Sequence, residues 1–285
     1  MIKTPLSTVL GGAFWTPGCT VLGGQQNLTQ IIKSIFSVGW QGFAYDPNDL
    51  TTMWQDQAKL LPVTGEGQPV WHILDKSGNN NHAFATSSAT RPILQRNATT
   101  GAYYLAFDGV DDFLVTNSIN FTGTDKVSLF AGVRKLSDAS QGMITELSSG
   151  NVNGSFMLHC GGGSGSEAYT FGSRGSLTGY SYSLLTKSAY PLLVAPKSSV
   201  ITSEGVISSD VSKIKVDRTY TSSNPSIDQG TGNYGNYPLY IGRRGGTSLP
   251  FNGHLYGLIG IGRLTTDSET ITLEKSIAKN TGVTL

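Results

Sequence analysis

Three aspartates stand within five residues in the stretch DGVDD. Asp108, Asp111 and Asp112 offer carboxylate oxygens, which Ca²⁺ prefers as ligands. Turn chemistry is the alternative, because Asp-Gly favours a tight connection and Asp side chains accept hydrogen bonds from nearby backbone amides. Ca²⁺ needs six or more oxygens, and no spacing like that of an EF-hand occurs here. The sequence therefore predicts a structural turn that needs no cofactor, with these three residues as the candidate Ca²⁺ ligands.

The carboxylates and histidines form no recognisable catalytic set. A glycoside hydrolase that retains configuration needs two carboxylates about 5–5.5 Å apart, which alternate residues on one strand supply. None of the glutamates has an Asp and a second Glu at such a spacing, and the histidines form no ligand-spaced pair. The sequence also lacks the G-x-S-x-G, H-E-x-x-H and P-loop motifs. We therefore expect the protein not to be an enzyme.

Aromatic and basic residues gather in two glycine-rich stretches, 161–183 and 234–244. Aromatic faces stack on sugar rings, and Arg satisfies hydroxyl groups. The alternative is that these side chains are ordinary loop and subunit-contact residues, and the sequence leaves both interpretations open. The candidate glycan contacts are Tyr169, Tyr180, Tyr182, Tyr234, Tyr237, Arg243 and Arg244.

Alternating apolar residues predict the strands that position these groups. Residues 103–107 alternate with the period of a pleated strand, and a second apolar run at 113–115 follows the DGVDD turn. Residues 127–133 show the same alternation, and 236–246 and 250–263 read as further strands. The pattern therefore predicts an all-β fold in which DGVDD joins two strands.

A short amphipathic helix is predicted over residues 27–38. Asn27 is a suitable N-cap, Gln30 can complete a capping box, and Gly39 supplies the stop. The apolar residues of this helix form one stripe, which has to cover a sheet face or, as the alternative, a neighbouring chain. Its apolar residues are Leu28, Ile31, Ile32, Ile35 and Phe36.

A second helix is predicted at the C-terminal end of the sequence. Thr266 and Glu269 have the spacing of a capping box, and Gly282 is a suitable stop. Glu274 falls on the apolar side of this helix. A carboxylate in that position needs a partner, so we expect an Arg or a backbone amide beside it.

The composition bounds the function. Lysine and arginine number 20, and aspartate and glutamate number 19, so the formal net charge is +1. A nucleic-acid-binding surface would show a basic excess, and we expect no nucleic-acid partner. Charged residues make up only 14% and glycines number 36, as in β-proteins with many turns. Apolar and aromatic residues recur throughout, which argues against disorder.

No export or membrane signal is visible. The first residues lack the apolar run of a signal peptide, and no stretch approaches the ~20 apolar residues of a membrane-spanning helix. We therefore expect synthesis in a cytoplasm without a signal peptide and no membrane insertion. Cys19 and Cys160 have no context typical of a disulfide framework, so we expect free, buried thiols.

Several motifs in one order resemble a laminin-G-like domain of the concanavalin A-type lectin and glucanase class. The resemblance is closer still to the version of this domain in structural proteins of tailed phages and prophages. It covers residues 45–285 and includes the C-terminal AKNTGVTL. The motifs are LDKSGNNNHA at 74–83, RPIL at 91–94, YYLAFDGVDDFLV at 103–115, LYIGRRGG at 239–246 and FNGHLYGLIGIGRL at 251–264.

The resemblance implies a fold for the domain at 45–285: a two-sheet antiparallel jelly-roll sandwich with a short C-terminal helix. Residues 1–44, an N-terminal arm and a short amphipathic helix, lie outside the resemblance, and we expect them to form a docking or oligomerisation segment. The large apolar residues Phe14 and Trp15 of the arm either anchor on a partner subunit or fold into the chain's own core. The candidate partner-docking residues are Phe14, Trp15, Ile31, Ile35 and Phe36.

The resemblance also implies a function. We expect a non-enzymatic phage structural protein on the virion surface, made in the host cytoplasm, that serves as a capsid decoration, head fibre or tail-fibre component. Its expected partners are other virion proteins, further copies of itself, with a trimer favoured by virion symmetry, and host surface glycans. A carbohydrate-binding adhesin is the alternative, and a glycan hydrolase is a third, less favoured one.

Overall fold

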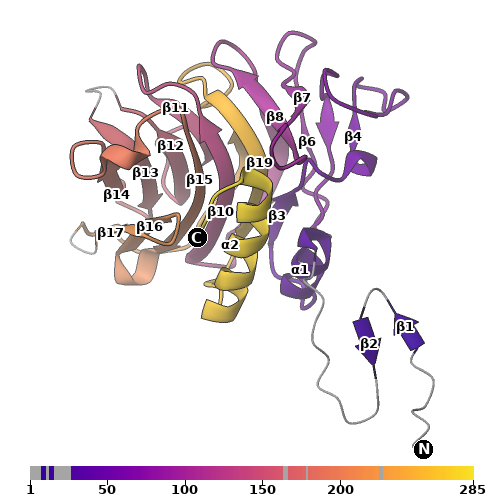
Figure 1. Ribbon diagram of the computed structural model, residues 1–285. Coiled ribbons are helices and arrows are strands. Elements are labelled where there is room, and N and C mark those ends of the chain that lie inside the picture. The colour runs from indigo at the N-terminus through magenta and orange to yellow at the C-terminus, as the bar shows by residue number, and fades with distance from the viewer. Residues whose placement is uncertain (1–7, 11–12, 16–26, 163–165, 178, 225–226) are drawn as a thin grey trace, which may run out of the picture.

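Two antiparallel β-sheets packed face to face form the body of the molecule (Figure 1). The computed structural model describes residues 8–10, 13–15, 27–162, 166–177, 179–224 and 227–285. Within these residues, α1 (Leu28–Ile35) and α2 (Asp267–Thr281) are the two α-helices, and neither is long and apolar enough to cross a bilayer. The predicted all-β sandwich with an N-terminal and a C-terminal helix is confirmed.

One sheet has eight strands in the described part of the chain. Its order is β17-β16-β15-β10-β19-β8-β7, and β3 pairs with the C-terminal part of β19. The strands are β3 (Gly42–Tyr45), β7 (Ile93–Arg96), β8 (Tyr103–Asp108), β10 (Lys126–Lys135), β15 (Lys197–Val206), β16 (Val211–Val216), β17 (Tyr220–Ser223) and β19 (Asn252–Ile261).

The other sheet has nine described strands in the order β14-β13-β12-β11-β18-β9-β6-β5-β4. Met53 and Trp54 form β4, which is an edge strand of this sheet. The strands are β4 (Met53–Trp54), β5 (His72–Ile73), β6 (Ala83–Phe84), β9 (Leu114–Asn120), β11 (Gly142–Leu147), β12 (Ser155–Cys160), β13 (Glu167–Arg174), β14 (Ser181–Thr186) and β18 (Asn236–Ile241).

The main core lies between the two sheets. Val127, Leu129 and Val133 of β10 point into it and are fully buried, as the alternation predicted. Cys160 also lies in this core as a free thiol, whereas Cys19 lies outside the described residues. The DGVDD turn connects β8 of the eight-stranded sheet to β9 of the nine-stranded sheet. It is therefore a corner of the sandwich.

The two helices cover the outer face of the eight-stranded sheet (Figure 1). The stripe of α1 packs with Ile277 of α2 and with Phe130 and Ile259 of the sheet. This confirms that the stripe covers a sheet face. Both predicted capping boxes are present, and Gly282 closes α2 in the left-handed conformation. Helix α1 ends earlier than predicted, at Ile35, because the residue after it already leaves helical geometry.

Glu274 on α2 has the partners that its burial demands. Its side chain is 1% exposed and lies against the sheet. The Lys215 ammonium is 2.7 Å from one carboxylate oxygen, and the Arg218 guanidinium is 3.0 Å from the other. Thr202 donates a hydrogen bond of 2.8 Å to the first oxygen. The predicted Arg partner is confirmed.

The DKSGNNNHA motif holds β3 in place. Both carboxylate oxygens of Asp75 accept hydrogen bonds, from the backbone N–H groups of Ala44, Ser77 and Asn81. The Asn81 side chain donates to the carbonyl oxygen of Gly42 at 2.7 Å. Because a carboxylate fully supplied with donors is stabilised even when buried, this motif clamps β3 against β19.

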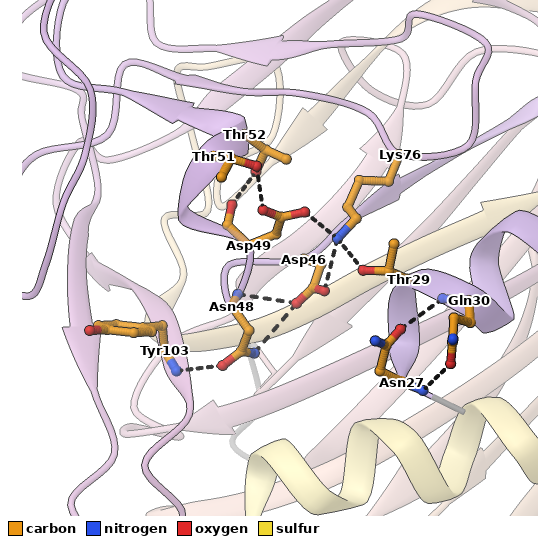
Figure 2. Close-up of polar contacts among 10 residues, drawn as sticks. All are labelled: Asn27, Thr29, Gln30, Asp46, Asn48, Asp49, Thr51, Thr52, Lys76 and Tyr103. Carbon is orange, nitrogen blue, oxygen red and sulfur yellow. Dashed lines mark hydrogen bonds and ion pairs between the residues drawn. The ribbon is translucent and has the colours of Figure 1, made fainter. Parts of the chain in front are cut away.

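A buried ion-pair network also holds α1 against the sandwich (Figure 2). The Lys76 ammonium lies 2.7 Å from Asp49 and 3.3 Å from Asp46, and it donates to the Thr29 hydroxyl of α1 at 2.6 Å.

The predicted boundary between residues 44 and 45 falls inside the strand β3 (Gly42–Tyr45). That residues 1–44 act as a docking unit stays a prediction.

The N-terminal arm is described only in two short strands. β1 (Thr8–Leu10) and β2 (Ala13–Trp15) pair with each other in antiparallel register. The side chains of Phe14 and Trp15 lie outside what the structure describes, so their docking role stays a prediction. Ile31, Ile35 and Phe36 are buried within the chain, and docking through them stays a prediction as well.

Candidate functional site

The outer face of the nine-stranded sheet, which we call the open face, carries the candidate site. One continuous row of residues crosses this face. Each strand contributes one residue to the row, and each residue is the cross-strand partner of the next. Cross-strand partners share a face. On every strand of the row except β14, a residue beside the row's member belongs to the core, so the row points outward. The row is Trp54, His72, Phe84, Val115, Tyr240, Glu146, Met157, Gly172 and Tyr182.

The row presents aromatic rings at both of its ends. Trp54 and Phe84 are half-buried at the β4 end, and Tyr182 is 37% exposed at the β14 end. A Cβ atom at Gly172 would lie 3.1 Å from the Tyr182 ring, so the glycine lets this ring lie against the sheet. With strands about 4.8 Å apart, the row is about 38 Å long. An extended ligand can therefore contact several rings at once.

The centre of the row holds a buried ion pair. Arg244 donates from Nε and Nη2 to the two carboxylate oxygens of Glu146, at 2.8 and 3.1 Å. Burial raises the pKa of Glu146, and the hydrogen bonds from Arg244 lower it. The carboxylate is fully buried, and both of its oxygens are engaged by the guanidinium. Glu146 is therefore a structural partner of Arg244 and is not placed as a general acid or base.

A buried polar pair lies beside the centre of the row. His159 of β12 and Thr170 of β13 are cross-strand partners, 2% and 3% exposed. Gln141 is 2.9 Å from His159 Nε2, whereas His159 Nδ1 and Thr170 Oγ1 have no hydrogen-bond partner within the described residues. Burial lowers the pKa of His159 to about 4. The ring is thus neutral at physiological pH.

A hollow of about 440 Å³ lies at the β4 end of the open face. Its lining includes His72 and Phe84 of the row, so the hollow and the row form one surface. We call it the edge pocket. Its lining residues are Gln57, Trp71, His72, Phe84, Ala85 and Thr86.

The structure places two of the predicted glycan contacts, Tyr182 and Arg244, on the open face. Tyr180 lies against Tyr182, but it is only 5% exposed, and its hydroxyl is 2.5 Å from Ser155 Oγ. Tyr237 and Arg243 are half-buried outside the row. Their side chains donate to the carbonyl oxygens of Asn153 and Thr247 respectively.

The prediction is wrong for Tyr169 and Tyr234. They are 0% and 1% exposed and belong to the core between the sheets. Tyr169 points inward because it alternates with Thr170 along β13, and the Tyr234 hydroxyl is 2.6 Å from the buried Ser173. Neither ring can therefore stack on an external sugar.

The three aspartates of the DGVDD corner do lie together, with ligand oxygens within 4.8 Å of one another. Asp108 accepts the backbone N–H groups of Val110 and Asp111, and Asp112 accepts that of Asp108. Burial raises the pKa of Asp112 to about 7. These bonds confirm the predicted turn chemistry. They also occupy oxygens that Ca²⁺ would need, and a Ca²⁺ site here stays a prediction.

Sequence reasoning missed most of the row. His72, Phe84, Tyr240 and Glu146 were not recognised as members of one surface. Strands β4, β5 and β6 have two residues each, too few to show a period. Only long-range pairing sets their register. The sequence offered one signal for this surface, the stretch LYIGRRGG, in which an aromatic residue lies in a strand pattern and two arginines come directly after it.

Comparisons with known proteins support the fold. No family model matches the sequence, and no curated protein matches it. Similar solved structures include the binding domain of botulinum neurotoxin serotype D, at 10% identity and a TM-score of 0.53, covering 86% of this chain and 52% of that one. The neurotoxin DC binding domain in complex with rat synaptotagmin II matches at 11% identity and a TM-score of 0.53, covering 79% of this chain and 50% of that one.

A third match comes from botulinum neurotoxin type C, which depends on interaction with two ganglioside molecules to enter cells. It has 10% identity and a TM-score of 0.53, and it covers 86% of this chain and 53% of that one. This chain thus spans about half the length of the solved structures that it matches. At such low identity the likeness shows a shared β-sandwich fold.

Proposed function

We propose that the protein is a non-enzymatic, glycan-binding β-sandwich displayed on the particle of a tailed phage, with the open face as its sugar-binding surface. The observation that carries the proposal is the row, which presents the rings of Trp54, His72 and Phe84 at one end and that of Tyr182 at the other. Pyranose faces stack on aromatic rings, and hydroxyl groups bond to amide, guanidinium and imidazole groups. A sheet face of this kind suits an extended oligosaccharide.

Two further observations favour binding over catalysis. Glu146 is the carboxylate of the row, and Arg244 engages both of its oxygens, whereas hydrolysis needs two carboxylates across the scissile bond. Two of the similar solved structures are described as receptor-binding domains. Another comes from a toxin that interacts with gangliosides, which supports a role in recognising glycans.

The place on a phage particle rests on the resemblance of residues 45–285 to phage structural proteins. Capsid decoration, head fibre and tail fibre all fit a short chain of this kind. Its partners on the particle are other virion proteins and further copies of itself. Residues 1–26 precede the clamped helix α1, and we assign the docking role to them.

Glycan binding is tested on an array of bacterial surface polysaccharides and oligosaccharides. The wild-type protein should bind a subset, and Tyr182→Ala should bind at least tenfold more weakly, because stacking on one ring contributes on the order of 1.4 kcal/mol. Trp40→Ala is the control, because Trp40 is 43% exposed but lies outside the row. Absence of binding by the wild-type protein, or release of reducing sugars during incubation, would overturn the proposal.

Placement on a particle is tested by deleting residues 1–26. This deletion leaves α1 with its capping residue Asn27 and the Lys76 network intact. The truncated protein should give an unchanged far-ultraviolet circular dichroism spectrum and should be missing from purified particles in immunogold micrographs. If truncated and full-length protein enter particles equally, the docking role of residues 1–26 is wrong.

A further inference from the structure

The edge pocket closes one end of the row. We propose that it holds the terminal sugar ring of a bound glycan, a neutral pyranose, so that the protein recognises chain ends. This inference rests on the proposed function and deepens it, because it names which part of a glycan is bound and where.

The walls of the pocket are aromatic. Trp71 and Phe84 are among the lining residues, and the His72 ring lies 6.2 Å from that of Phe84. The volume of about 440 Å³ lies in the lower part of the range of small-molecule sites, roughly 300–1,000 Å³. Aromatic walls around a hollow of this size suit the apolar face of one sugar ring.

The polar groups of the pocket suit sugar hydroxyls. His72 Nε2 lies 3.0 Å from the carbonyl oxygen of Gln57. A carbonyl oxygen can only accept, so Nε2 carries the proton and Nδ1 of the neutral ring is an acceptor. Burial lowers the pKa of His72, which favours the neutral ring. Among the described residues Nδ1 has no partner, and it can accept a hydroxyl proton.

A fixed loop closes the outer end of the pocket. Gln57 belongs to the loop that follows the edge strand β4, and it meets His72 through its carbonyl oxygen. The Asp56 carboxylate accepts the backbone N–H groups of Leu60 and Leu61, and Arg91 donates to the carbonyl oxygen of Gln55 at 2.9 Å. The loop therefore lies beside His72 at the outer side of the pocket, and in this proposal a glycan that follows the row ends against it.

The charge of the pocket selects a neutral sugar. None of the six residues that line it carries a formal charge while His72 is neutral. The nearby Arg91 lies over the Trp71 ring, and its guanidinium donates to the carbonyl oxygens of Ser88 and Gln55. It is therefore already engaged. Lys59 of the loop after β4 lies over the Trp54 ring, and the Asp56 carboxylate opposes its charge at His72, so a sugar carboxylate meets no excess of positive charge there.

The test is saturation-transfer NMR of the full-length protein with methyl α-glycosides of glucose, galactose, mannose and rhamnose, and with methyl glucuronoside as the charged probe. At least one neutral glycoside should show transfer. Phe84→Ala should weaken its binding at least tenfold, and Trp40→Ala, which changes an exposed ring outside the row, should leave it unchanged. His72→Phe serves as a second pocket variant, because it keeps an aromatic ring and removes the acceptor.

The outcomes separate the two proposals. If no glycoside binds while an array polysaccharide still binds through Tyr182, the chain-end pocket is wrong and glycan binding by the open face stands. If neither the glycosides nor the polysaccharides bind, both proposals fail. Equal binding of the glucuronoside, or binding unaffected by both pocket variants, would also overturn the inference.

Discussion

The two outer faces of the sandwich are built from different residues. The face of the eight-stranded sheet is apolar under the helices, where Phe130, Val200 and Ile259 are at most 1% exposed. The open face of the other sheet carries half-buried aromatic rings and the pair of Glu146 with Arg244. The first face needs a cover to remove apolar surface from water. On the second, a small apolar cluster that includes Met157, Tyr180 and Leu249 covers the centre, and the rings at the two ends of the row meet water.

The difference teaches where binding can occur on this fold. A face that helices seal contributes to stability and is closed to ligands. A face that mixes rings with satisfied polar groups can remain solvated and still offer stacking surface to a sugar. Side chains on the covered face should therefore matter for unfolding, and exposed rings on the open face should matter for ligand binding.

The largest effect on stability is expected from Ile32→Ala on the covered face. Ile32 is fully buried between α1 and the sheet, and truncating such a residue costs about 3 kcal/mol of unfolding free energy. Urea unfolding of the wild type and the variant measures it, with the exposed Ser34→Ala on the same helix as the control. A loss below about 1 kcal/mol would mean that α1 does not seal the sheet.

A smaller loss is expected at the centre of the open face. Glu146→Gln leaves the Arg244 guanidinium without its charged partner and should cost about 2 kcal/mol. The double variant Glu146→Gln, Arg244→Met should lose less than the sum of the single changes, by about 1 kcal/mol. Strictly additive losses in a denaturant-based double-mutant cycle would contradict the pairing.

A pH-dependent effect is expected at the corner that joins the two sheets. The Asp112 pKa is raised from 3.8 to about 7, so the folded state keeps a proton that the unfolded state releases as pH rises from about 4 to 7. The contribution of Asp112 to stability therefore falls over this window in the wild type, and Asp112→Asn, which does not titrate at this position, lacks that change.

We subtract the unfolding free energy of the wild type from that of Asp112→Asn at each pH. This difference should be about 2 kcal/mol larger at pH 8 than at pH 4. This change in unfolding free energy is about half of the value that the full pKa shift of Asp112 would give, because solvent at the turn screens the charge. Urea unfolding at the two pH values measures it. A difference that does not change with pH would show that Asp112 ionises normally.

The smallest effect on stability is expected from Tyr182→Ala on the open face. Its ring is 37% exposed, so its removal should cost no more than about 1 kcal/mol, while glycan binding falls. Thermal unfolding and the glycan array, run on the same preparation, measure the two quantities. If stability falls as far as in Ile32→Ala, the ring is part of the core and the contrast between the faces is lost.

Much of the fold was predictable from local patterns. The alternation in β10, the capping boxes at Asn27 and Thr266, and the need of Glu274 for a partner were each visible in the sequence and are present in the structure. Each depends on residues close together in the chain or on a burial cost that holds in any fold. The predicted site was less successful, because Tyr169 and Tyr234 lie in the core.

The sequence by itself therefore determined the class of fold, the two helices and the turn chemistry of the DGVDD corner, because periodicity and capping act over a few residues. Only the tertiary structure decided which residues meet on the open face. Trp54 and Tyr182 lie at opposite ends of one row because strand pairing over long sequence distances sets the register. A shift of one residue in any strand would turn its member of the row into the core.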